Sequence, residues 1–302
     1  MTSEEPLIAI VSSGRMANRM FQLMLAHEIR NRAGVGQILG CHLPRSGLVS
    51  PLPEVAPEPY AVLVNHAFDL DHAAYLLRTG VLRSIVIQGW GMRLAYYKSP
   101  QPYRELFQSP VRGHVLRDDE LLIHVRAGDI LDLHHPYYFP MPFSFYEEVI
   151  AATGLKPVFI GQLDDDPYSD ALRRRFAGAK FLPRRSSVED FTTIRQAPHI
   201  LLSISSFSWL ATWLSESVES VHMPIYGLFD PRIGQTFLLP VDDRRWRFYE
   251  IDVPERETHK DLDVVAWAER TASLGRLGEA QLRALAIHGI APKQSAVSAS
   301  PE

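Results

Sequence analysis

The chain has 302 residues, of which 46% are hydrophobic and 22% charged, and its formal net charge is -4. A single core usually stops growing near ~250–300 residues, so two domains are expected. The weakly acidic charge balance excludes a general nucleic-acid binder. The single cysteine, Cys41, excludes a disulfide framework and a zinc site built from cysteines.

The N-terminus lacks the features of a secretion signal. Glu4 and Glu5 stand where a signal peptide needs positive charge, and the apolar run after them is short. No window approaches the ~18 consecutive apolar residues of a membrane span. We therefore expect a cytoplasmic protein without a membrane span.

The first part of the chain alternates short apolar runs with helical patterns. The apolar runs predict buried strands over residues 7–11, 61–65 and 84–88. Apolar residues at helical spacing predict helices over 18–32, which Gly34 would end, and over 69–78. This alternation is typical of a parallel sheet flanked by helices.

A second α/β series begins near residue 120. Strands are predicted over 121–125, 157–161 and 200–204, and helices over 145–153, 169–176, 187–196 and 207–217. Helical patterning returns over 258–288. Two series predict an α/β fold with two Rossmann-like domains facing a cleft, and ligands in such sheets bind beyond the carboxyl ends of the strands.

The domain boundary is expected within residues 107–119, which are polar and rich in turn formers. We assign residues 1–112 to an N-terminal Rossmann-like domain and 113–285 to a C-terminal one. Residues 286–302 are interpreted as a disordered tail, because the last of them are mostly Ser, Ala and Pro.

Charged side chains gather at the end of the predicted strand 121–125. His124 and Arg126 are two residues apart, so they point the same way in extended chain, and Asp129 follows in the turn. An arginine at such a strand end can hold a phosphate with two parallel hydrogen bonds. The alternative is an ion pair that ties the strand end to a neighbouring helix.

Ser205 and Ser206 lie between the predicted strand 200–204 and the helix after it. Hydroxyls and amide groups at a helix N-terminus form an anion site. The alternative is an ordinary serine cap of the helix.

The first strand–helix turn carries Gly14 and Asn18. It does not match G-x-G-x-x-G and it lacks the lysine of a P-loop, so it does not indicate a dinucleotide or ATP site. Gly14 permits a tight turn. Asn18 either caps the helix, which is the interpretation favoured by the turn alone, or reaches into the cleft.

Together these segments resemble the α-1,2-fucosyltransferases. Residues 14–22, G-R-M-A-N-R-M-F-Q, resemble the family's G-G-L-G-N-Q-M-F-Q; residues 124–129, H-V-R-A-G-D, resemble H-V-R-R-G-D; and residues 205–209, S-S-F-S-W, are similar to part of N-S-S-F-S-W-W. Weaker similarities at 87–97 and 159–165 lie between them. The resemblance runs in order from about residue 7 to about residue 214.

The resemblance implies a GT-B fold in which the second domain binds a GDP-sugar and the first lies on the acceptor side. It implies an inverting, metal-independent glycosyltransferase that transfers fucose from GDP-fucose to a hydroxyl of an oligosaccharide or polysaccharide, without a cofactor. It also implies the residue roles: His124 and Asp190, sixteen residues before Ser206, contact guanine, and Arg126 holds the β-phosphate.

Further roles complete the predicted donor site. Ser205 and Ser206 assist Arg126 at the diphosphate, and Gly14 and Asn18 join the donor site. Arg126 and Asp129 are the predicted catalytic residues, with Asp129 orienting the arginine or the turn. As a base for the acceptor hydroxyl, position alone offers Asp129, Asp132, His134 and His135.

Two features of the sequence leave alternatives open. Ala127 replaces the second arginine of the family motif, so a catalytically silent GDP-sugar-binding protein, or a transferase using another nucleotide sugar, remains possible. An Ala127→Arg change is expected to be tolerated. The run 164–166, Asp-Asp-Asp, is a candidate metal site, although its place before Pro167 favours a solvated turn.

Overall fold

The computed structural model describes residues 5–132, 138–233, 236–251, 263–271 and 274–290. Contacts between residues divide the chain into two compact units. Unit 1 comprises residues 5–108, 236–239 and 287–290, and unit 2 comprises residues 109–233 and 240–286 within the described ranges. No helix in the described part of the chain is both long and apolar enough to cross a membrane.

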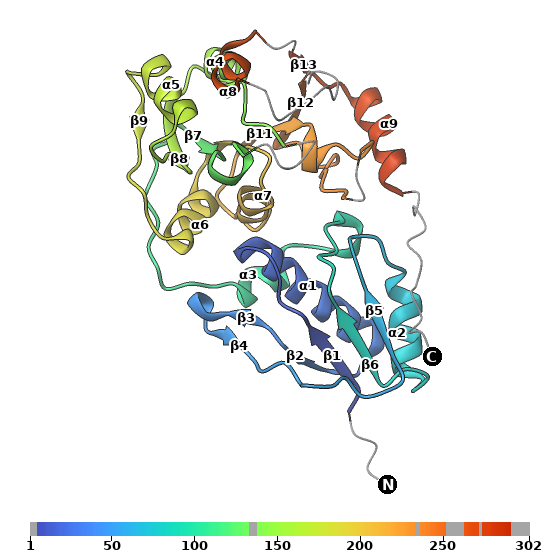
Figure 1. The fold of residues 1–302 in the computed structure, drawn as a ribbon. Helices are drawn as coiled ribbons and strands as arrows, with labels where there is room; N and C mark the ends of the chain where they lie inside the picture. The colour runs from blue at the N-terminus through green and yellow to red at the C-terminus, as the bar shows by residue number, and fades with distance from the viewer. Residues whose placement is uncertain (1–4, 133–137, 234–235, 252–262, 272–273, 291–302) are drawn as a thin grey trace. The chain divides into compact units, whose positions relative to one another are not determined.

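Unit 1 is built on a parallel sheet in the order β2-β1-β6-β5. Its elements are β1 (Leu7–Ile10), α1 (Met16–Ala33), β2 (Gln37–Leu39), β3 (His42–Leu43), η1 (Pro44–Ser46), β4 (Leu48–Val49), β5 (Tyr60–Leu63), α2 (Leu70–Arg78), β6 (Ser84–Ile87), η2 (Leu94–Tyr96) and α3 (Gln101–Leu106). Helices α1 and α2 pack against each other (Figure 1). As the sequence predicts, Gly34 ends α1 in a left-handed conformation.

Unit 2 is built on a seven-stranded sheet. Its elements are β7 (Glu120–Val125), η3 (Gly128–Ile130), α4 (Phe143–Thr153), β8 (Lys156–Gly161), α5 (Pro167–Arg175), β9 (Lys180–Phe181), α6 (Ser187–Gln196), β10 (His199–Leu201), α7 (Ser206–Trp213), β11 (Ser220–Ile225), η4 (Gly227–Phe229), β12 (Trp246–Ile251), α8 (Val264–Glu269), β13 (Leu274–Arg276) and α9 (Glu279–Ile290).

The strand order in unit 2 is β13-β12-β11-β10-β7-β8-β9, and only β13 is antiparallel to its neighbour. The six parallel strands have the Rossmann order, in which the chain moves outward from β7 to β9 and then returns to β10. Right-handed crossovers therefore place α4 and α5 on one face of the sheet and α6 and α7 on the other (Figure 1). All six residues of β7 are buried, as a central strand requires.

The structure differs from the sequence predictions in several element bounds. The strand expected over 200–204 ends at Leu201, and the helix expected over 207–217 ends at Trp213. The helical region expected over 258–288 contains the short strand β13 between α8 and α9. The tail predicted from residue 286 begins inside α9, which continues to Ile290; residues 291–302 lie outside the described ranges.

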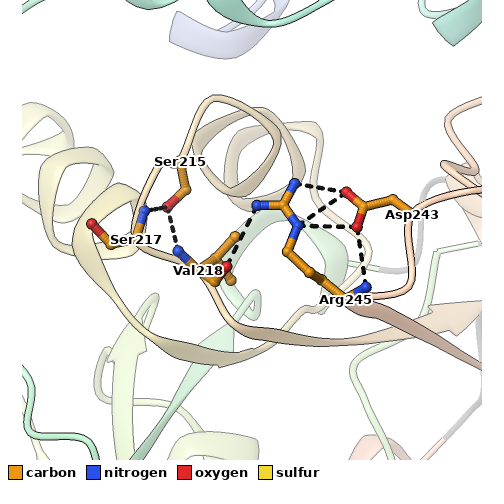
Figure 2. A network of polar contacts seen from close by, with 5 residues as sticks. All are labelled: Ser215, Ser217, Val218, Asp243 and Arg245. Carbon is orange, nitrogen blue, oxygen red and sulfur yellow. Dashed lines mark hydrogen bonds and ion pairs between the residues drawn. The ribbon is translucent and has the colours of Figure 1, made fainter.

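Polar contacts join the loops that precede β11 and β12, at the amino ends of these strands in the larger sheet (Figure 2). Arg245 donates to both carboxylate oxygens of Asp243, at 2.6–3.1 Å, and to the carbonyl of Val218 at 3.4 Å. Ser215 accepts hydrogen bonds from the amides of Ser217 and Val218. Burial raises the pKa of Asp243, but the hydrogen bonds from Arg245 outweigh it and hold the pKa below its usual value.

We predict that Asp243→Ala lowers the free energy of unfolding by about 1–2 kcal/mol, because it removes several charge-assisted hydrogen bonds at a partly exposed site. The pKa of Asp243 is lower in the folded protein than in the unfolded chain, so its contribution is present at neutral pH and is lost as the pH falls below about 4. Urea midpoints at pH 7 and at about pH 3, below the ordinary pKa of an aspartate, measure both effects. Asp165→Ala, at an exposed carboxylate, is the control and should change the midpoint little.

The backbone of Gly161 approaches β7 so closely that no side chain fits there. Its φ is 119°, and a Cβ atom would clash with the carbonyl oxygen of Val125. Gly154 also has a positive φ, of 68°, but a Cβ atom there would point into open space. We predict that Gly154→Ala costs about 1–2 kcal/mol from backbone strain alone. Gly161→Ala should cost at least about 3 kcal/mol, because the β7 backbone must also move. Equal losses in denaturant unfolding would contradict this account.

Candidate functional site

Two neighbouring strands of unit 2 end at the point where the order of the sheet reverses. Strand β10 pairs with β7 through Ile200↔Leu122 and Leu201↔Ile123. The helices that follow these two strands lie on opposite faces, and sheets of this class bind ligands outside two such carboxyl ends. Residues 124–129 span the end of β7 and the turn after it, and residues 205–206 follow β10, so both segments lie at this switch point, which we call the crevice.

Arg126 is fixed at the crevice by contacts from two directions. Its Nη1 donates to the carbonyl of Ile204 at 2.8 Å, and its Nη2 pairs with the Asp129 carboxylate at 3.2 Å. The Tyr138 ring lies 5.3 Å from the guanidinium carbon. The ion pair considered from the sequence is therefore present, but its partner is Asp129 in the same turn. These bonds engage two of the five N–H donors of the guanidinium.

His124 is buried, with 5% of its surface exposed. Its Nδ1 lies 2.7 Å from the hydroxyl of Ser203, and its ring lies 6.0 Å from that of Phe207. Burial, reinforced by the charge of Arg126, lowers the pKa of His124 to about 3. The imidazole is therefore neutral at pH 7, so it can act on a ligand through hydrogen bonding and packing but not as a cation.

The serine turn forms the start of α7. Ser205 is the N-cap residue, and its hydroxyl accepts from the amide of Phe207 at 3.3 Å. The capping role considered from the sequence is thus correct for this hydroxyl. Ser206 is the first helical residue and is partly exposed. The amide groups of this N-terminus lie beside the crevice, where the helix dipole favours an anion.

Asp190 lies in the first turn of α6 and faces Arg185. The carboxylate Oδ1 is 3.9 Å from Arg185 Nε, too far for a hydrogen bond. Oδ1, Nε and the Arg185 Nη2 are all buried and have no hydrogen-bond partner within the part of the chain that the structure describes. Burial raises the pKa of Asp190 to about 6, while Arg185 opposes the rise and Glu189 adds to it.

Aromatic contacts connect α6 with the rest of the site. The Phe191 ring lies 5.4 Å from that of Phe207, which in turn lies beside His124. Buried polar groups without partners are uncommon in folded proteins and call for a ligand, ion or water. The sequence did not draw attention to Arg185, because it falls in no recognised motif.

The first strand–helix turn belongs to unit 1. Helix α1 begins at Met16, with Arg15 as its N-cap residue, so the interpretation of Asn18 as a cap is wrong. Asn18 lies one turn along, over Gly14, whose φ is 72°; a Cβ on Gly14 would approach Asn18 Nδ2 to 2.5 Å. The fully buried Gln22, which the sequence assigned no role, bonds the amide of Ser13 and the carbonyl of Val11, both at 3.0 Å.

The acidic run 164–166 is used for local structure. Asp166 is the N-cap residue of α5 and accepts from Ser169, and Asp164 pairs with Arg184 at 2.8 Å. Within the described ranges, no group of three or more His, Cys, Asp or Glu side chains is placed to hold a metal ion.

The remaining predicted residues fall in different environments. Asp132 is exposed, whereas His134 and His135 lie outside the described residues. Ala127 is fully buried, so the expectation that arginine would be tolerated there is wrong: the larger, charged side chain would have to displace packed neighbours.

Comparison with known proteins gives limited similarity. No protein-family model matches the chain, and no curated protein matches its sequence. Among solved structures, the chain is similar to an arginine-to-lysine mutant of Arabidopsis thaliana FUT1 in complex with GDP. The TM-score is 0.44 and the identity 10%, and the match covers 91% of this chain and 75% of that chain. Because both values are low, no assignment of function depends on this likeness.

Proposed function

We propose that the chain is a glycosyltransferase that binds a GDP-sugar at the crevice of unit 2 and transfers the sugar, with fucose as the expected one, to a glycan hydroxyl. The observation that carries this proposal is Arg126, an arginine fixed at the switch point of a Rossmann-ordered sheet beside the N-terminus of α7. Both groups favour a bound diphosphate. The motif resemblance supplies the choice of donor.

In this mechanism the acceptor oxygen bonds to the anomeric carbon while the bond from that carbon to the β-phosphate oxygen breaks, with inversion. The electron pair of the broken bond leaves with GDP, and the hydroxyl proton passes to a base or to water. Arg126 meets the charge that develops on the β-phosphate. Asp129 and the carbonyl of Ile204 hold the guanidinium in place, so little reorganisation is needed as charge develops. The mechanism requires no metal ion.

Asp190 and Arg185 provide the groups that a guanine base requires. Guanine presents N–H donors at N1 and N2, which suit the unpartnered Asp190 Oδ1, and an acceptor at O6, which suits the unpartnered nitrogens of Arg185. An adenine base presents an amino group at the position of O6, so it would face Arg185 with a donor. This pairing favours GDP over ADP.

A second candidate function is a GDP-sugar-binding protein without transferase activity. It is favoured by Ala127, because that buried position cannot supply the second arginine of the family motif. One measurement separates the two candidate functions. Both predict GDP binding, but only the glycosyltransferase predicts turnover of the donor.

We predict that Arg126→Ala lowers turnover of GDP-fucose by about 10²–10³, the loss seen when one preorganised donor to a developing anion is removed. Arg126→Lys should recover only part of the rate, since an ammonium cannot form two parallel bonds. Transfer and donor hydrolysis are measured in EDTA, with melting temperatures as the control for folding. A folded Arg126→Ala protein with unchanged GDP affinity and unchanged turnover would rule out the mechanism, and loss of wild-type activity in EDTA would rule out metal independence.

The raised pKa of Asp190 predicts a pH-dependent affinity for GDP. Guanine needs the ionised carboxylate, and a pKa of about 6 means that protonation removes it as the pH falls from 7 to 5. The dissociation constant should rise over this range, by at most about tenfold per pH unit for one proton. In Asp190→Asn the part of the pH dependence that comes from the carboxylate should disappear, leaving that of the terminal phosphate of GDP, and the preference for GDP over UDP and ADP should weaken. Tighter binding of UDP than GDP by the wild type would refute the base assignment.

A further inference from the structure

The outer strands of unit 2 carry a cluster of basic side chains on one face. His222 of β11 is the register partner of Arg247 of β12, and Tyr249 of β12 is the partner of Arg276 of β13. Partners across a ladder share a face, as do residues two apart on a strand, so these four side chains lie on the same face. We call His222, Arg247, Tyr249 and Arg276 the outer basic cluster.

Two nitrogen atoms of this cluster are buried without a partner. His222 is 2% exposed, and its Nδ1 lies 2.8 Å from the Tyr249 hydroxyl. Its Nε2 and Arg247 Nη1 are buried and have no hydrogen-bond partner among the residues that the structure describes. If the tyrosine hydroxyl donates to Nδ1, then Nε2 carries a proton, and two adjacent donors lack an acceptor. A buried donor without an acceptor is unfavourable, and an acceptor supplied by a ligand would remove this penalty.

The cluster contains two guanidinium groups and has one carboxylate near it within the described residues: burial raises the pKa of Tyr249, and the charge of Glu148 on α4 adds to this rise. Neither Arg247 nor Arg276 forms an ion pair there, whereas Arg232 and Arg245 nearby along the chain are each paired with an aspartate. Burial and the charges of Arg247 and Arg276 lower the pKa of His222 to about 4, so this histidine is neutral and the two guanidinium groups supply the positive charge.

The outer basic cluster is separate from the nucleotide crevice. Trp246 of β12 contacts Trp209 of α7, so α7 packs on the face to which Trp246 points. Tyr249 points to the other face, where it contacts Phe145 of α4. The cluster therefore lies on the face opposite α7, on the three strands β11, β12 and β13 that follow β10 in the sheet order.

We propose that the outer basic cluster is a second anion site, which binds a tetrahedral oxyanion such as a phosphate or sulfate group. Arg276, which is exposed, and the partly exposed Arg247 supply positive charge, and the buried nitrogens of His222 and Arg247 supply hydrogen bonds. The Tyr249 hydroxyl fixes the orientation of the imidazole. This inference does not require unit 2 to bind a GDP-sugar.

The test is titration of the full chain with inorganic phosphate, followed by ³¹P NMR and calorimetry in the presence of excess GDP. The wild type should show saturable phosphate binding. Arg247→Gln and Arg276→Gln should each weaken it by about tenfold or more, the loss expected for one charge-assisted hydrogen bond. Arg283→Gln is the matched control, because that arginine is exposed and lies on α9. Sulfate should compete with phosphate, and chloride should not.

The result that would overturn the proposal is unsaturable phosphate binding, or equal affinity in the wild type and both cluster variants. Arg276→Gln keeps the test decisive if Arg247→Gln does not fold, since Arg276 is exposed. Titration of Arg126→Ala with phosphate separates the two sites. If phosphate binding is lost in Arg126→Ala and kept in the cluster variants, phosphate binds at the crevice and the second site is refuted. We expect Arg276→Gln to bind GDP with unchanged affinity. Failure of the second anion site can therefore be recognised separately from failure of the GDP-sugar site.

Discussion

The crossover after β7 runs to one face of the larger sheet and the crossover after β10 runs to the other. This reversal leaves the carboxyl ends of two central strands without a helix between them, and polar groups can gather there without interrupting the packing of the sheet. Arg126 and the start of α7 meet at this point because each follows one of the two strands. The proposed chemistry therefore depends first on the strand order of unit 2.

The charges around the crevice are arranged to favour an added anion. A charged imidazole at His124 would be both desolvated and repelled by Arg126, and it remains neutral for these reasons. Asp129 compensates part of the arginine's charge and fixes its direction. At the amino ends of β11 and β12, in contrast, Asp243 and Arg245 satisfy each other. Within the described residues, groups with unmet hydrogen-bonding capacity occur at both proposed ligand sites, and also at Arg32 Nε and Thr212 Oγ1, for which no ligand is proposed.

Many elements were predictable from local patterns alone. The bounds 187–196 of α6 follow from its serine cap and apolar spacing, and Gly34 ends α1 as expected. Strand β11 was not predicted, because His222 and Pro224 interrupt its apolar pattern; it is a strand because β10 and β12 pair with it on both sides. Pairing with β12 likewise makes β13 a strand inside a region of helical composition. The local propensity of a segment does not show which strands will pair with it, since the partner strands are distant in sequence.

The sequence by itself determined which residues could form a diphosphate site: a strand ending in His124 and Arg126, and a serine turn before a helix. Only the tertiary structure decided that these segments are neighbours, that the Ile204 carbonyl holds Arg126, and that Arg185 stands beside Asp190. It also shows that Ala127 is buried, so that an arginine side chain there would have to displace packed neighbours. The physical reason is that motif and periodicity are properties of adjacent residues, whereas burial and unmet hydrogen bonds arise only when distant segments pack together.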